Sequence, residues 1–454
     1  MTDIDLTQGS ILGHIRRIAI PSSIGFLFNT LFNVVDTYYA GKLSTDALAG
    51  MTISFPIFFI VIALSSGVGS GTTALSAIAL GKKDVKQFHN LAYNAMVISL
   101  VLCVVIIVTA PVITTFLFKI SGASGEAMKL GIDYTKVIFY GAVFFILNSV
   151  INGLLNAQGD TKSNRNFLVT GFFMNLFLDP LFIFGWFGLP RMGVIGVGLA
   201  TVIVQFFGTI YLIYRLHKSP IFNWSDFKTS KMSRLTFNQL IKQGVPASLN
   251  MVTVAIGVFV INYFVLLYTE ATTIAAYGAA MRVEQLALLP AFGLNIAALT
   301  MAGQNYGAKN MARIYEVKKI TLAIGVGIMV LGGLIIYPLA PFLIGLFNSD
   351  PGVIEAGAFY LRIEAFAFPT YVILNLILSV LQGVKRPNFA IFIGLYRQIV
   401  VPVLLFTLLG TVLKFGITGI WWGIVVINWS AVFIAVVYSK RQLRQVEAEL
   451  LGEL

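Results

Sequence analysis

Apolar segments long enough to cross a membrane follow one another along almost the whole chain. A helix needs about 20 apolar residues to cross the hydrocarbon core of a bilayer. Here 57% of the 454 residues are hydrophobic, only 11% are charged, and the mean hydropathy is +0.87. A soluble chain has about a quarter of its residues charged. The sequence therefore predicts an all-α polytopic membrane protein with room for about twelve transmembrane helices.

The apolar runs and the polar stretches between them set the expected helix positions. The segments predicted to be helical are 11–41, 48–78, 88–118, 131–157, 163–187, 193–217, 238–268, 272–304, 312–347, 356–382, 387–411 and 416–440. The single cysteine, Cys103, lies in one of these apolar runs, so we expect it to be a packing or lipid-facing residue and exclude a disulfide framework.

The basic residues follow this topology. A net charge of +12 by itself would suggest a nucleic-acid partner, but most of the 31 lysines and arginines fall in connections on one side of the predicted membrane. By the positive-inside rule this side is cytoplasmic, and it includes both termini. We therefore expect the lipid bilayer as the surroundings, no nucleic-acid partner, and location in a prokaryotic cytoplasmic (inner) membrane.

The chain reads as two copies of one design. Landmarks in the first half recur about 225 residues later in the same order, which indicates a duplicated unit. The pairs are IPSS at 20–23 with VPAS at 245–248, GKKD at 81–84 with GAKN at 307–310, and GVIGVG at 193–198 with GITGIW at 416–421. We therefore predict an N-lobe (1–217), a cytoplasmic linker (218–238) and a C-lobe (239–454), with six helices in each lobe.

Two parallel six-helix repeats are typical of transporters, in which the substrate path commonly runs between the halves. The chain has no phosphate-binding G-x-x-x-x-G-K-[ST] loop, so we expect no ATP hydrolysis, and uphill transport must draw on an ion gradient. The glycine-rich GVGSGTT at 67–73 lies inside an apolar helix, where close helix packing explains it. We predict neither an enzyme nor a bound cofactor.

Two acidic residues lie inside predicted helices of the first half, Asp36 and Asp179. An ionised group in hydrocarbon costs at least about 2.5 kcal/mol, so such residues face a partner, water or a cation. Further polar residues recur on these and neighbouring helices at spacings of three or four, hence on shared faces: Asn29, Asn33, Asn148, Asn152, Asn156, Asn175, Thr201 and Gln205. Hydrogen bonds that only hold the bundle together explain a single asparagine well, whereas the two aspartates favour a transport pathway.

Prolines and the charges of the second half complete the list of candidates. Pro180 frees the carbonyl of Leu176 beside Asp179, and we expect Pro21 to kink the first helix. The second half has Ile261 where Asp36 stands in the first. Its intramembrane charges are Arg282 with Glu284, Arg362 with Glu364, and Arg397. We predict structural ion pairs between helices for these, with substrate contact or gating as the alternative.

These motifs together resemble the multidrug and toxic compound extrusion (MATE) family, DinF-like branch. The resemblance covers nearly the whole chain and rests on IAIPSS, NVVDTYYAGKLSTDALAG, the GKKD loop, NLFLDPLFIFG and GVIGVGLATVIVQ. It implies two six-helix lobes that export bulky organic compounds, often cationic or aromatic, in exchange for H⁺ or Na⁺. It also implies a cation site at Asp36, Asn175, Asp179 and Thr201, a helix hinge at Pro21, and a functional monomer.

Another function is open within the same superfamily. Related exporters flip lipid-linked saccharides or peptidoglycan precursors, and we expect these to line their cavity with cationic residues. Here the first half puts acids and amides in the predicted pathway, with Asn29, Asn33, Asn148, Asn152 and Gln205 lining the substrate cavity. The antiporter is therefore our main expectation and the flippase the alternative. No metal other than a coupling Na⁺ is expected.

Overall fold

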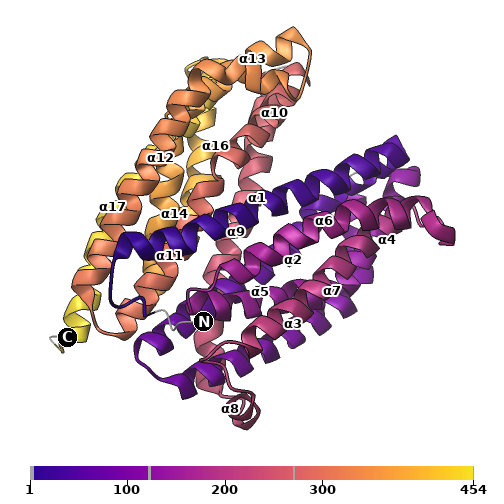
Figure 1. The fold of residues 1–454 in the computed structure, drawn as a ribbon. Coiled ribbons are helices and arrows are strands. Elements are labelled where there is room, and N and C mark those ends of the chain that lie inside the picture. The colour runs from indigo at the N-terminus through magenta and orange to yellow at the C-terminus, as the bar shows by residue number, and fades with distance from the viewer. Residues whose placement is uncertain (1–4, 121–123, 269–270, 453–454) are drawn as a thin grey trace. The chain divides into compact units, whose positions relative to one another are not determined.

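The chain is folded entirely into helices and their connections within the residues that the computed structural model describes, 5–120, 124–268 and 271–452 (Figure 1). The helices of the first half and of the linker are α1 (Ile11–Leu43), α2 (Thr45–Gly81), α3 (Val85–Ile120), α4 (Gly125–Tyr140), α5 (Ala142–Ala157), α6 (Lys162–Phe184), the short η1 (Trp186–Gly188), α7 (Val194–His217) and, within the linker, α8 (Trp224–Thr229).

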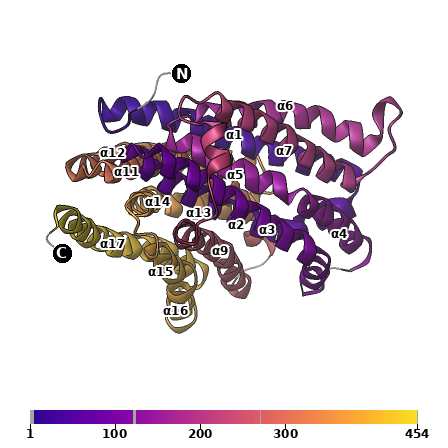
Figure 2. The ribbon, with the colours of Figure 1, turned by 90° about the horizontal axis from the view of Figure 1, so that it is seen from below.

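The second half repeats this pattern of long helices. Its elements are α9 (Arg234–Tyr268), α10 (Ala271–Ala287), α11 (Leu289–Gly307), α12 (Met311–Gly345), α13 (Pro351–Glu364), α14 (Phe368–Gly383), α15 (Phe389–Leu395), η2 (Tyr396–Val400), α16 (Val401–Phe406), η3 (Thr407–Val412) and α17 (Gly416–Leu451). α17 packs against α16 and η2 (Figure 2).

Among the described residues, nine helices are long and apolar enough to cross a membrane, or up to twelve spans if each of three bent pairs counts as one. The predicted all-helical membrane fold is confirmed, but three predicted helices are each broken in two. The bends are 46° between α4 and α5, 44° between α10 and α11, and 51° between α13 and α14. The sequence supplies the cause: Gly141 stands at the first break, and Pro290 and Pro369, which lack a backbone N–H, stand at the starts of α11 and α14.

The chain forms two compact units whose limits differ from those of the predicted lobes. The first unit consists mainly of Ile24–Ser248, and the second of Leu6–Ser23 together with Leu249–Leu454. The start of α1 therefore belongs to the second unit and the start of α9 to the first. The division into functional lobes at 1–217 and 239–454 stays a prediction.

The same helix contact recurs in both units. In the first unit a Cβ added to Gly67 of α2 would collide with Ser248 of α9. In the second unit a Cβ added to Gly293 of α11 would collide with Ser23 of α1. These residues correspond in the two sequence repeats. Small residues at such crossings allow the backbones of membrane helices to approach closely, as expected for GVGSGTT.

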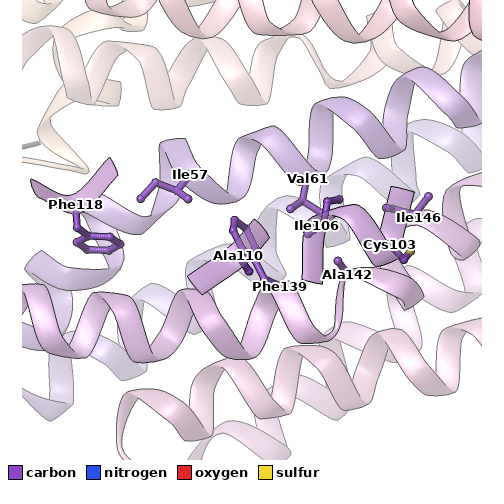
Figure 3. Packing of buried hydrophobic residues seen from close by; sticks show 9 residues of the cluster. All are labelled: Ile57, Val61, Cys103, Ile106, Ala110, Phe118, Phe139, Ala142 and Ile146. Carbon is purple, nitrogen blue, oxygen red and sulfur yellow. The ribbon is translucent and has the colours of Figure 1, made fainter. Parts of the chain in front are cut away.

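An apolar cluster holds α2, α3, α4 and α5 together in the first unit (Figure 3). Its members include Ile57 and Val61 of α2, Cys103 and Ile106 of α3, and Phe139 of α4. The Cys103 side chain is only 3% exposed, so it is a packing residue rather than a lipid-facing one.

Candidate cation site

The two acidic residues of the first half meet through an asparagine. Asn175 of α6 donates its Nδ2 hydrogens to Asp36 Oδ1 of α1 at 2.5 Å and to Asp179 Oδ2, one turn further along α6, at 3.0 Å. All three side chains are buried. One amide group therefore bridges the two carboxyl groups, and like charges this close disfavour joint ionisation. The site therefore holds two buried acids that share one amide donor.

α7 adds a hydroxyl to this group. Thr201 Oγ1 lies 3.2 Å from Asp36 Oδ2 and also 3.1 Å from the Val197 carbonyl oxygen of its own helix. One hydroxyl hydrogen cannot serve both acceptors fully. The spare lone pairs of Thr201 and the unpartnered Oδ1 atoms of Asn175 and Asp179 are oxygens of the kind that hard cations bind.

The two acids have no ion-pair partner in the part of the chain that the structure describes. Among residues 5–120, 124–268 and 271–452, none of the recorded ion pairs includes Asp36 or Asp179. A buried carboxylate without a positive partner is costly unless it binds a proton or a cation. The arrangement can therefore bind and release one of these.

The junction of α6 and α7 positions Thr201. Gly193 begins the turn into α7 with φ +56° and ψ −130°, a conformation that favours glycine. A Cβ on Gly196 would lie 2.8 Å from the Phe182 carbonyl carbon and 2.9 Å from the Ile183 nitrogen. Both glycines belong to GVIGVG, so this motif brings the start of α7 against the end of α6 and places Thr201 beside the acids.

Both predicted hinge prolines lie inside continuous helices, Pro21 in α1 and Pro180 in α6. The Leu176 carbonyl, which Pro180 leaves without its helical N–H, faces the Tyr39 hydroxyl at 3.5 Å. Hinge motion at either proline stays a prediction. Tyr39 connects α1 to α6 one turn after Asp36, and the i+3 spacing from Asp36 is the sequence signal that marks it.

The remaining polar residues of the first unit divide into two groups. Asn148 of α5 donates Nδ2 to the carbonyl oxygen and to Oε1 of Gln205 on α7, at 3.0 and 2.8 Å, while Asn152 is half-buried with an unpartnered Oδ1. Asn29 and Asn33 are exposed, and Asn33 donates only to the Asn29 carbonyl of its own helix. They thus lie outside the Asp36 site, and a role in the substrate cavity stays a prediction for all of them.

Within the described part of the chain, none of the recorded ion pairs includes the second-half charges that we predicted to pair. Arg282 is exposed with its guanidinium 5.9 Å from the Phe347 ring centre, and Arg362 lies over the Tyr337 ring in the same way. Their neighbours Glu284 and Glu364 are buried. Residues two apart stand on nearly opposite sides of a helix, so each arginine points out and each glutamate in. Arg397 contacts Asn428 Oδ1 at 3.4 Å and the Tyr371 ring.

Tyr134 of α4 is a site neighbour that sequence reasoning missed. It is 7% exposed and lies within electrostatic range of both Asp36 and Asp179. Tyr134 follows Asp133 on α4, but no acid or amide three or four residues away from it on this helix singles it out. A Cβ added to Gly198 of α7 would lie only 3.4 Å from the Tyr134 ring. The absence of a side chain at Gly198 therefore lets Tyr134 pack closely against α7.

Known proteins resemble this chain along most of its length. The family model described as MatE matches residues 21–181 and 246–407. The chain is 26% identical over 453 residues to "Multidrug export protein MepA" of Staphylococcus haemolyticus, covering 98% of each. It is 28% identical over 350 residues to "Probable multidrug resistance protein NorM" of Thermotoga maritima, covering 75% of this chain and 73% of that protein. A solved structure described as the outward-facing conformation of a multidrug resistance MATE family transporter matches with a TM-score of 0.92 at 26% identity, covering 98% of this chain and 99% of the other.

Proposed function

This chain belongs to the MatE family, whose members are membrane transporters and not enzymes, and from that premise we propose that it is a secondary active multidrug efflux antiporter. It exports organic compounds, often cationic or aromatic, in exchange for H⁺ or Na⁺. The relatives named as multidrug export and resistance proteins support the substrate class.

The observation that carries the proposal is the buried Asp36–Asn175–Asp179 group with no positive partner among the described residues. A proton or Na⁺ bound there compensates the negative charge in one state. When the cation leaves, the charge is restored and demands water or a cationic substrate. Because both ligands draw on the same charge, each weakens the binding of the other by the same factor. Cation release on one side of the membrane thereby drives substrate exchange.

The acidic character of this site favours antiport over the flippase alternative. A lipid-linked pyrophosphate is anionic, and Asp36 and Asp179 would repel it. We also propose that the protein acts as a monomer in a prokaryotic cytoplasmic membrane. Both termini should lie in the cytoplasm, and reporter fusions to the two termini test this orientation.

Transport by purified protein in liposomes tests the main proposal. An imposed pH or Na⁺ gradient should drive export of cationic dyes by the wild type. Asp36→Asn keeps the size of the side chain but removes its charge, so it should abolish gradient-driven export while leaving membrane insertion intact. The matched control is Asp46→Asn, which removes an exposed acid in the first turn of α2. Normal export with normal ion dependence in Asp36→Asn would contradict the mechanism.

A further inference from the structure

A second pair of buried acids lies in the second unit. Glu284 of α10 is 9% exposed and Glu364 of α13 is fully buried. Each has one carboxylate oxygen without a hydrogen-bond partner, Oε1 of Glu284 and Oε2 of Glu364. The two groups lie within electrostatic range of each other. Two such carboxylates cannot both stay charged in this setting without compensation, because like charges disfavour joint ionisation and burial penalises each one.

Tyrosine side chains enclose the pair. The Tyr371 hydroxyl of α14 donates to Glu364 Oε1 at 2.6 Å, and the Tyr360 hydroxyl faces Glu284. The Tyr360 ring lies 4.5 Å from the Trp421 ring of α17, and Tyr277 stacks on Trp421 at 5.6 Å. Tyrosine hydroxyls thus meet the acids, and the Tyr277 and Tyr360 rings are packed against Trp421.

The positively charged side chain of Arg397 reaches this cluster. Its guanidinium carbon lies 5.5 Å from the centre of the Tyr371 ring, on the tyrosine that donates to Glu364. With the Gln398 amide turned so that its oxygen faces Arg397, that oxygen accepts from Nη2 at 2.8 Å and from Nε at 3.3 Å. Arg397 stands on η2, a π-helical turn. Such turns are rare inside helices and are frequent at functional sites.

The charged and titratable groups that face the pair come from four elements. They are Tyr277 and Glu284 on α10, Tyr360 and Glu364 on α13, Tyr371 on α14 and Arg397 on η2. Two acids that share one proton carry one negative charge, and a single guanidinium balances it.

We propose that Arg397 is a built-in counter-cation that keeps the Glu284–Glu364 pair neutral, so that the second unit exchanges no ion with the surroundings. Arg397 acts through Tyr371 and is therefore a positioning residue. The proposal deepens the proposed function, on which it rests, by assigning ion coupling to the Asp36 site alone.

A comparison of charge-removing and charge-keeping variants tests this in the full-length protein. The variants are Arg397→Gln, Arg397→Lys and the double variant Arg397→Gln/Glu364→Gln, and the measurement is the apparent Tm in detergent across a series of Na⁺ concentrations and pH values. A ligand that binds only the folded state raises Tm as its concentration rises. Because the first unit is the same in every variant, its own ion response cancels in the comparison.

We expect Arg397→Gln to have a lowered Tm that rises with added Na⁺ or with acidification, since the uncompensated pair must take up a cation. Arg397→Lys should respond to ions like the wild type. The double variant, which removes both charges, should regain most of the lost Tm and lose the extra ion response.

Two results would overturn the proposal: the same ion response in Arg397→Gln and Arg397→Lys, or a double variant no more stable than Arg397→Gln. If Arg397→Gln yields no monodisperse protein, recovery of folded protein in the double variant supports charge balance, and equal loss in both contradicts it. The Tm series does not measure transport, so its outcome does not depend on whether the antiport proposal holds. A failure of the Arg397 proposal can therefore be distinguished from a failure of the antiport proposal.

Discussion

The crossing of α2 and α5 in the first unit depends on the absence of a side chain at Gly153. A Cβ added there would lie 2.5 Å from the Gly69 carbonyl oxygen, where an ordinary contact is 3.4 Å or more, and 3.2 Å from Thr73 Oγ1. The nearest obstacle is backbone inside α2, which cannot rotate away as a flexible side chain can. Gly153→Ala must therefore push the two helices apart or bend one of them.

The size of the effect follows from two opposing terms. Overfilling a well-packed site costs about 1–3 kcal/mol, and the backbone obstacle places Gly153→Ala at the upper end. Alanine recovers about 1 kcal/mol through its better helix propensity. The net loss of folding free energy should be about 2 kcal/mol. Gly327→Ala is the matched control, because a Cβ on Gly327 in α12 meets nothing within 4 Å and only the favourable term remains.

The assay is the fraction of protein that stays monodisperse after heating, measured by size-exclusion chromatography of detergent-solubilised variants. Gly153→Ala should lose the monodisperse peak at a temperature several degrees below that of the wild type, and Gly327→Ala at the same temperature or above. Equal midpoints for the two variants would refute the argument that backbone contact, rather than helix propensity, sets the cost at this crossing.

Two further predictions concern side-chain hydrogen bonds. Thr201→Val removes the hydroxyl 3.2 Å from Asp36 Oδ2, and a hydrogen bond to a charged group contributes about 1.5–3 kcal/mol, so dye export at a fixed ion gradient should fall about tenfold or more. The control Thr52→Val removes an exposed hydroxyl that is bonded within α2, and this variant should export normally. Equal export rates for the two variants would show that Thr201 takes no part in transport. Asn94→Ala removes two hydrogen bonds that join α3 to the linker: Asn94 Nδ2 donates to the Lys231 carbonyl oxygen at 3.2 Å, and the Ser233 N–H donates to Asn94 Oδ1 at 3.0 Å. Trypsin should therefore cut at Lys231 about tenfold faster in this variant. An unchanged cleavage rate would mean that other contacts hold the linker.

The part of the site that the sequence predicted is the part that depends on helix periodicity. The four-residue spacing of Asn175 and Asp179 places them on one face of α6, and the structure joins them to Asp36 and Thr201. These residues stand out because polar groups inside apolar helices are rare. Their functional role is still a prediction.

What the sequence did not predict depends on contacts between helices. Tyr134 comes beside the acids through the packing of α4 against α7 and α2, and periodicity within one helix carries no record of such contacts. The predicted ion pairs of Arg282 and of Arg362 with acids on other helices are absent among the described residues for a related reason. Hydropathy shows that a residue lies in a span, but not which way its side chain points. The two-residue spacing of each arginine and glutamate indicates that the two side chains point to opposite sides of their helix, in addition to excluding a pair between them.

The exchange of segments between the two units constrains how the chain can fold during synthesis. The first unit includes the start of α9, up to Ser248, and the second includes Leu6–Ser23. The ribosome must therefore make part of the second repeat before the first unit is complete, and the N-terminal segment must wait for α11 and α12 before it reaches its own partners, among them Gln304 and Arg313. Neither repeat expressed alone carries all the residues of one unit. Halves separated at the linker should consequently be poor folding units on their own and should regain stability only when they are made together.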